Sequence, residues 1–304
     1  MSFSGQIKQE LCRAALNKKC CAQAEAYGIL LYCTNFQRSG VRITTESDAF
    51  AARLPLLFKK AFQLEFDQLP PDKPGKRTFL ITDPAKIRMI GEVFGHDPEE
   101  SVALHINFGV LEEDHCRTAF FRGAFLAGGA VIDPEKGYHL ELVTPHFNVG
   151  REMPALLRES GFNPKSTERK ANYVTYFKHS EYIEDFLTAI GAPVAAMEIM
   201  NTKLEKNLRS SVNRRVNCDA ANLDKTVDAA QGQIEAIRRL EDRGTLEELP
   251  DKLREAAVLR IENPELTLTQ LAALCSPTVT KSAFNHRLRK LMALADQREK
   301  EREK

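Results

Sequence analysis

The chain has 304 residues, 43% of them hydrophobic, and a formal net charge of +1 at pH 7. This length and apolar content exclude a disordered chain and allow two folded domains. The near-zero charge excludes a uniformly basic protein, so any binding of nucleic acid has to depend on a local concentration of cations.

The first residues, Met1 to Gly5, lack the basic region and apolar run that mark a secretory leader. No segment approaches the roughly 18 consecutive apolar residues that a membrane-spanning helix needs. We therefore predict a cytoplasmic protein with no membrane partner.

Seven cysteines occupy positions 12, 20, 21, 33, 116, 218 and 275. No two of them are separated by the two to four residues of a zinc hairpin, so the spacing predicts no metal site and no cofactor. In a reducing compartment such cysteines are expected to be small core residues. Cys20 and Cys21 are then simply residues near the start of a buried helix.

The first two thirds of the chain contain an internal repeat with a shift of 95 to 100 residues. Each copy is expected to have a helix, strands, a second helix, strands and a third helix. Gly28 and Gly123, 95 residues apart, fall inside the first helix of each copy and predict a close approach between these two helices. We predict an α+β fold class, with a duplicated αββαββα domain over residues 1–192. Chance coincidence is the alternative. The matched segments are 22–32 with 120–131, 41–45 with 139–143, 54–60 with 153–159, and 78–82 with 173–178.

The first helices of the two copies carry a recognisable motif. Residues 121–129, FRGAFLAGG, resemble a worn LAGLIDADG motif, and residues 26–34 resemble a more worn copy. The resemblance to LAGLIDADG homing endonucleases implies two motif helices packed at a pseudo-twofold axis and saddle-shaped sheets that straddle DNA.

In that family the metal-binding acid stands at the eighth motif position, which holds Cys33 and Gly128 here. Neither residue offers the carboxylate oxygen that Mg²⁺ requires, so we predict that the domain does not cut DNA. Asp133 and Glu135 follow shortly after the second motif, but a turn beyond the helix end is poorly placed to replace a ligand at the packed interface.

A connecting segment is predicted over residues 193–222. Pro193 suits the first turn of a helix, and a basic run follows at 203–215. Arg214 and Arg215 either contact DNA phosphates or belong to a solvated linker. Residues 217–222 are rich in capping residues and predict a turn, with Asp219 capping the next helix. That helix carries an apolar stripe that can pack on the last part of the chain, at Val227, Ala230, Ile234, Ile237 and Leu240.

Residues 223–304 are predicted to form a helical DNA-binding domain, with three short helices between 248 and 295. The middle helix begins at Thr267, where Gln270 can complete a capping box, and Ser276-Pro277 ends it. The final helix begins after Thr280. Its apolar residues recur at helical spacing, at Phe284, Leu288, Leu291 and Ala295. The pattern predicts a helix-turn-helix at about 267–295.

The polar faces of this final helix predict how it binds DNA. The residues that project away from the apolar stripe are expected at base edges: Ser282, Asn285, His286 and Arg289. The cations on the flanks are expected at phosphates: Lys281, Arg287 and Lys290. No acid occurs between residues 276 and 295. The alternative is an amphipathic helix with a solvated basic face.

Taken together, a worn LAGLIDADG pair and a helix-turn-helix resemble the WhiA-type sporulation and cell-division regulators of Gram-positive bacteria. The match spans nearly the whole chain and is most specific at Cys20-Cys21 and at residues 121–129, 213–222 and 281–289. The resemblance implies a DNA-binding transcriptional regulator without nuclease activity, linked to division, chromosome segregation and, in spore formers, sporulation.

Double-stranded DNA is thus the predicted partner, with a second regulatory protein as a further possible partner and a nucleoid-associated location in the cytoplasm. Two alternative functions stay open. One is an active endonuclease, and the other is a protein-binding or structural role in which the basic helix touches only protein.

Overall fold

The computed structural model describes residues 2–71, 75–96 and 103–300, without the side chains of 298–300. The chain divides into two compact units, residues 1–206 and 207–304, and each is described by itself. Among the described residues, no helix combines the length and the hydropathy that crossing a bilayer demands.

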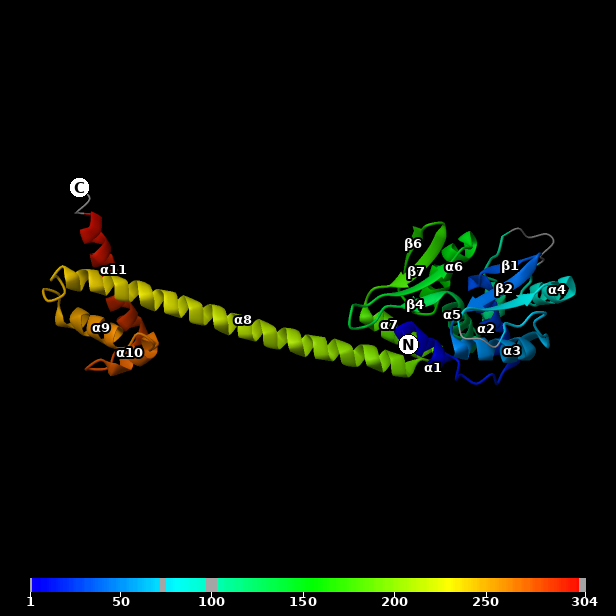
Figure 1. Cartoon of the computed structure of the whole chain (residues 1–304), viewed down its shortest axis with the longest axis horizontal. Coiled ribbons are helices and arrows are strands. Elements are labelled where there is room, and N and C mark those ends of the chain that lie inside the picture. Colours follow the sequence, from blue (N-terminus) through cyan, green and yellow to red (C-terminus); the bar gives the residue numbers. More distant parts are fainter. Residues whose placement is uncertain (1, 72–74, 97–102, 301–304) are drawn as a thin grey trace. The chain divides into compact units, whose positions relative to one another are not determined.

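The first half of the N-terminal unit alternates helices with a sheet of three described strands (Figure 1). Its antiparallel strand order is β1-β2-β3, with Ile43 of β2 opposite Phe79 of β3. The elements are α1 (Phe3–Leu11), α2 (Lys19–Tyr32), β1 (Asn35–Gln37), β2 (Gly40–Thr45), α3 (Asp48–Phe62), β3 (Arg77–Ile81) and α4 (Pro84–Val93).

The second half repeats this order of helices and strands and has one additional strand, β6 (Figure 1). Its four described strands run antiparallel in the order β4-β5-β7-β6. The elements are η1 (Phe108–Leu111), α5 (Asp114–Gly128), β4 (Gly129–Val131), β5 (Leu140–Thr144), α6 (Phe147–Glu159), β6 (Lys165–Arg169), β7 (Asn172–Phe177) and α7 (Ser180–Ile190).

The repeat predicted from the sequence is confirmed, down to individual prolines. Pro55 and Pro154 each occupy the eighth position of their helices, α3 and α6. One strand differs between the halves. Where the second half has β6, the described part of the first half has only the isolated bridge from Gln68 to Leu80. Pro70 and Pro71 follow that bridge, and prolines cannot donate hydrogen bonds to a strand ladder.

Helices α2 and α5 form the centre of this unit and approach each other unusually closely. A Cβ atom on Gly28 would lie 2.1 Å from the carbonyl oxygen of Phe120, and one on Gly123 would lie 1.9 Å from that of Glu25. Only glycine at these two positions permits this backbone contact. The close approach predicted from the glycines is therefore confirmed, and it explains why ten residues of α2 are buried.

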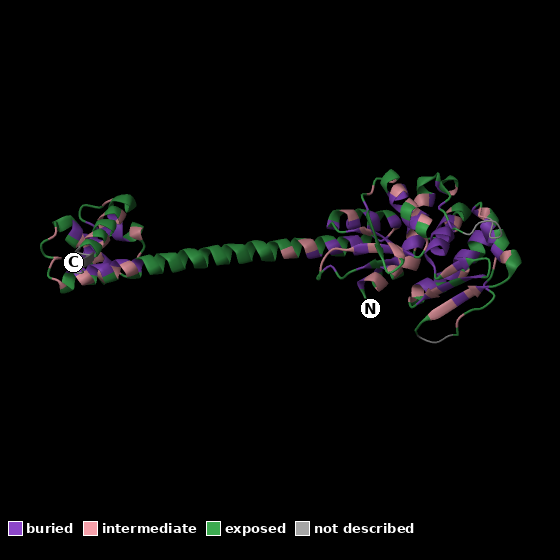
Figure 2. Ribbon diagram, turned by 90° about the horizontal axis from the view of Figure 1, so that it is seen from above, coloured by how far each residue is buried: buried purple, intermediate pink, exposed green. Residues whose placement is uncertain are grey.

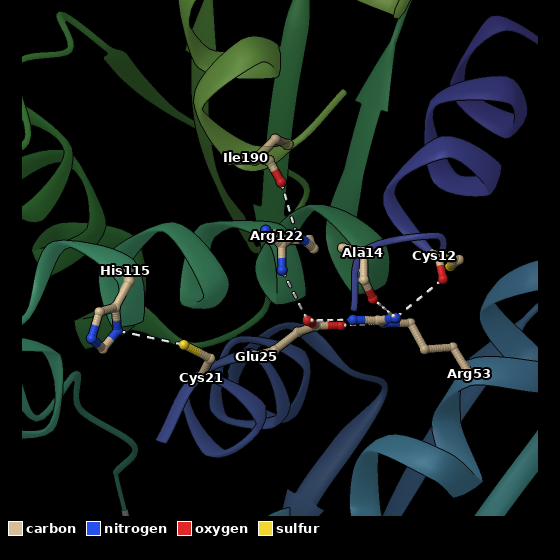
Figure 3. Close-up of polar contacts among 8 residues, drawn as sticks. All are labelled: Cys12, Ala14, Cys21, Glu25, Arg53, His115, Arg122 and Ile190. Carbon is tan, nitrogen blue, oxygen red and sulfur yellow. Dashed lines mark hydrogen bonds and ion pairs between the residues drawn. The ribbon is translucent and has the colours of Figure 1, made fainter. Parts of the chain in front are cut away.

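A buried ion cluster joins five parts of this unit: helices α2, α3, α5 and α7 and the connection between α1 and α2 (Figure 3). The Glu25 carboxylate accepts from Arg53 Nε at 2.6 Å and Nη2 at 2.9 Å, and pairs with Arg122 Nη1 at 3.3 Å. Arg53 also donates to the carbonyl oxygens of Cys12 and Ala14. Arg122 Nε donates to the carbonyl oxygen of Ile190, at the end of α7. The Glu25 side chain is only 1% exposed, so all of its charge is balanced inside the protein.

Helix α8 (Pro193–Asp242) begins at Pro193, as predicted, and its start is fixed to the N-terminal unit. Glu10 accepts from the backbone N–H groups of Val194 and Ala195, at 2.8 and 3.1 Å. Lys203 pairs with Glu181 at 2.8 Å, and Lys206 donates to the carbonyl oxygens of Pro134 and Glu135. Two cations of the predicted basic run thus hold the helix in place.

The turn predicted at residues 217–222 is wrong, because α8 continues through it without a break. Asp219 therefore does not cap a new helix. Neighbouring polar side chains bond back along the helix instead: Asn222 donates to Cys218 Sγ at 3.8 Å, and Thr226 donates to the carbonyl oxygen of Asn222 at 2.8 Å. Figure 2 shows that this stretch of α8 is exposed.

The C-terminal unit packs the end of α8 against the three predicted helices, α9 (Asp251–Glu262), α10 (Leu268–Leu274) and α11 (Lys281–Lys300), the last of which extends five residues beyond the predicted end at 295. Ile237 and Leu240 of the predicted α8 stripe are fully buried in this core. Val227 is an exception, because it is 53% exposed.

The prediction that the cysteines lie in the core is correct only in part. Cys33, Cys116 and Cys275 are buried, whereas Cys20 and Cys218 are exposed. Cys20 is exposed because it lies in the first turn of α2, and Cys218 is exposed because it lies on the solvent-exposed stretch of α8.

Candidate nucleic-acid interface

Helices α10 and α11 form the predicted helix-turn-helix, and local capping fixes both of their starts. The capping box at Thr267 is confirmed: Gln270 N–H donates to the Thr267 hydroxyl at 3.4 Å, and Thr267 N–H donates to Gln270 Oε1 at 2.9 Å. Helix α10 ends at Leu274. Thr280 then caps α11, because its hydroxyl accepts from Ala283 N–H at 3.2 Å.

The apolar stripe of α11 is buried, as predicted. Phe284, Leu288, Leu291 and Ala295 are each at most 1% exposed and pack with Leu271 and Ala272 of α10. Burying four apolar residues on one face fixes the rotation of α11 about its own axis. The residues between them are consequently turned toward solvent.

The outward face of α11 carries the residues predicted to contact DNA. Ser282, His286 and Arg289 are exposed, and Asn285 is half-buried beside them. Lys281 and Lys290 are exposed on the flanks. None of these six side chains bonds to another residue in the part of the chain that the structure describes. Their donors are available to an external partner that has phosphate oxygens and base edges.

Arg287 lies in a different environment from the other cations of α11. Its side chain is 15% exposed, and Nη1 pairs with Glu255 of α9 at 2.9 Å. The other Glu255 oxygen accepts from Ser276 N–H at 2.8 Å. The Arg287–Glu255 pair thus ties α9, the α10–α11 turn and α11 together, and the charge of Arg287 is already balanced. The spacing of residues along α11 could not reveal this ion pair, because Glu255 lies on another helix.

Arg214 and Arg215 lie on the exposed part of α8, within the C-terminal unit. Arg214 Nε donates to the carbonyl oxygen of Ser210 at 3.4 Å, one turn back in the same helix. Both side chains are exposed on a regular helix, as the predicted basic run of this helix requires.

At the second motif position, the structure leaves no room for the family's acid. A Cβ atom on Gly128 would lie 2.5 Å from the carbonyl oxygen of Val143 and 2.7 Å from Cδ1 of Tyr32. An aspartate there would require the backbone of β5 to move, because the nearest obstacle is a main-chain atom. The packing at the C-terminal end of α5 therefore excludes the motif's acidic side chain.

At the first motif position, Cys33 is 5% exposed. Its Sγ lies 3.2 Å from the carbonyl oxygens of both Leu30 and Asn35, so its single S–H can donate to either of them. Burial raises the pKa of this thiol to about 12, so it is neutral at pH 7. A neutral, internally bonded thiol does not suit Mg²⁺, which takes oxygen ligands. Asp133 lies in an exposed turn, where its carboxylate accepts from Glu135 N–H at 2.9 Å.

These features define a class of protein in which a duplicated LAGLIDADG-like domain without its metal-binding acids is joined to a helix-turn-helix domain. The WhiA C-terminal HTH domain model matches residues 212–295, and the WhiA LAGLIDADG-like domain model matches residues 117–209. The chain belongs to the WhiA family.

Similar proteins cover nearly the whole chain. One named probable cell division protein WhiA, from Alkaliphilus metalliredigens, is 36% identical over 310 residues, covering 97% of this chain and 98% of the relative. Another of that name, from Alkaliphilus oremlandii, is 37% identical and covers 97% of both chains. The crystal structure of full-length WhiA from Thermotoga maritima has the same fold, with a TM-score of 0.59 and 24% identity, covering 98% of this chain and 99% of that one.

Proposed function

We propose that this protein is a sequence-specific, DNA-binding transcriptional regulator that acts in cell division, chromosome segregation and, in a spore former, sporulation. The DNA-binding part of the proposal is carried by the six polar side chains of α11 that have no partner among the described residues. The link to cell division follows from relatives that are named probable cell division proteins, and chromosome segregation and sporulation are what the family resemblance implies. Such a protein works in the cytoplasm in association with the nucleoid, and a second regulatory protein is a candidate partner for the N-terminal unit.

Helix α11 is proposed to lie in the major groove. Arg289 and Asn285 read base edges, with Ser282 and His286 beside them, because these residues project opposite the buried stripe. The phosphates are held by Lys281 and Lys290, and by Arg214 and Arg215 of α8. Arg287 is left out of this set, because Glu255 already balances its charge.

The first prediction separates base contacts from phosphate contacts on this face. Arg289→Ala should weaken binding to the preferred duplex by about 1–3 kcal/mol and relax selection at one base pair. Lys290→Ala should weaken binding to all sequences alike and reduce the slope of log K against log salt by about 1. The measurement is a fluorescence anisotropy titration of the full chain, on a duplex selected from random sequence and on a scrambled duplex, at several salt concentrations.

Lys252→Ala is the matched control, since Lys252 is an exposed cation of the same unit on α9. It should leave affinity and salt slope unchanged. Equal losses on selected and scrambled duplexes for both α11 variants would contradict the assignment of Arg289 to a base edge.

The N-terminal unit is proposed to have no nuclease activity. We predict that the full chain leaves supercoiled plasmid intact with Mg²⁺ or Mn²⁺, because neither motif position offers a carboxylate and Gly128 has no space for one. Agarose gel electrophoresis of plasmid incubated with excess protein is the measurement. Metal-dependent nicking that Asp133→Ala abolishes would restore the endonuclease alternative.

A further inference from the structure

The start of α2 and the start of α5 bring three thiols and one imidazole together. Cys20 and Cys21 come from α2, and His115 and Cys116 come from α5. One ligand atom from each residue lies within 4.8 Å of the other three. His115 Nδ1 is 3.4 Å from Cys21 Sγ, a contact drawn in Figure 3, and 3.2 Å from Cys116 Sγ. We call these four residues the thiol–imidazole cluster.

The cluster follows the internal symmetry of the domain. His115 lies 95 residues after Cys20, and Cys116 lies 95 residues after Cys21, the same shift that relates Gly28 to Gly123. The members stand at the second and third positions of their helices, counted from Lys19 in α2 and Asp114 in α5. The glycine-mediated packing of the two helices therefore brings equivalent pairs face to face.

We propose that the thiol–imidazole cluster is a structural zinc site, with Cys20, Cys21, Cys116 and His115 Nδ1 as the four ligands. Three sulfurs and one imidazole nitrogen are a recognised ligand set of structural zinc, and soft thiolates select against Mg²⁺ and Ca²⁺. Bonds of about 2.3 Å at tetrahedral angles separate sulfur ligands by roughly 3.8 Å. The four ligand atoms lie within 4.8 Å of one another, so rotation of the side chains can bring them to that geometry.

The net charge of the zinc complex and the exposure of the cluster to solvent both favour zinc binding. Zinc with three thiolates and a neutral imidazole carries a net charge of −1, and this anion would lie against the positive ends of two helix dipoles. Zinc binds cysteine as thiolate, so ion binding displaces the thiol protons into solvent. The ion can enter from solvent, because Cys20 is exposed and Cys21 is only partly buried.

This site is distinct from the family's catalytic metal positions. Cys33 and Gly128 lie at the C-terminal ends of the same two helices, whereas the cluster lies at their N-terminal ends. Zinc there would cross-link residues 20 and 116 of the two halves and stabilise the pairing of the motif helices without taking part in chemistry. Cysteine spacing did not reveal this cluster, because spacing rules detect only ligands close in sequence.

The test uses the full chain, purified under reducing conditions with any histidine tag removed. Elemental analysis should find about one zinc per chain. Co²⁺ added to the metal-free protein should give the absorption bands of a tetrahedral thiolate complex. Cys20→Ser removes an exposed ligand, so the fold should survive. Zinc affinity, measured by competition with a chromophoric chelator, should fall by at least about tenfold. Cys218→Ser, which removes the other exposed cysteine, should bind as the parent does.

A second readout reports on stability. All six tyrosines lie between residues 27 and 182, and the chain has no tryptophan, so tyrosine emission follows the N-terminal unit alone. Zinc should raise the midpoint of its thermal unfolding in the parent and in Cys218→Ser, but much less in Cys20→Ser. Three results would overturn the proposal: no stoichiometric zinc or cobalt, equal affinity in Cys20→Ser and the parent, or a disulfide within the cluster in the reduced preparation.

Discussion

Gly123→Ala should destabilise the N-terminal unit by more than about 3 kcal/mol, above the usual range for overpacking a core. The added methyl group would lie 1.9 Å from the carbonyl oxygen of Glu25 and 3.1 Å from the amide nitrogen of Ile29. Both atoms belong to the backbone, so no side chain can rotate to relieve the clash. Helices α2 and α5 would have to separate, and the core between them would lose its packing. The measurement is urea unfolding of the full chain followed by tyrosine emission.

Gly232→Ala is the control for this variant, since it places the same methyl group inside helix α8 with no atom within 4 Å apart from the adjoining residues and backbone of its own helix. There the substitution should raise helix propensity by about 1 kcal/mol, which circular dichroism of the whole chain can follow. If Gly123→Ala unfolded at the parent's urea midpoint, the close backbone contact between α2 and α5 would be refuted.

The features that could be predicted from the sequence are those set by neighbouring residues. The capping box at Thr267 depends on two residues three positions apart, and the stripe of α11 depends on spacing within one helix. The internal repeat revealed the α2–α5 pair, because Gly28 and Gly123 mark the same contact from both sides. Local rules sufficed for the fold class and for the face of α11 that points outward.

The features that were missed depend on partners remote in sequence or on competition between local preferences. Glu255 balances Arg287 from another helix, and His115 meets Cys21 only after the two halves have packed. At residues 217–222, turn-favouring side chains were outweighed by an uninterrupted helix on both sides, where asparagine and threonine bond back along the helix. Such outcomes require the tertiary structure, because no single window of sequence contains both partners.

The second large effect concerns the buried ion cluster. Glu25→Ala should cost the N-terminal unit about 3–5 kcal/mol, because it leaves the guanidinium groups of Arg53 and Arg122 without their only described carboxylate. Glu65→Ala is the matched control in the same unit. The Glu65 side chain is 81% exposed and lies 3.8 Å from that of Lys59, which is 72% exposed, so its loss should cost at most about 1 kcal/mol. Urea unfolding followed by tyrosine emission measures both variants.

A double-mutant cycle distinguishes this cluster from a simple loss of packing. Once Glu25 is alanine, Arg53 is an uncompensated buried cation, so adding Arg53→Ala should cost far less than it does in the parent. Additive losses would mean that each side chain contributes through packing alone. A strongly non-additive cycle would instead assign the stability of this unit to charge balance. Arg53 also donates to the carbonyl oxygens of Cys12 and Ala14, in the chain that leads into α2. Through that connection the charge of Glu25 would stabilise the chain leading into α2, the helix that packs against α5 at Gly123.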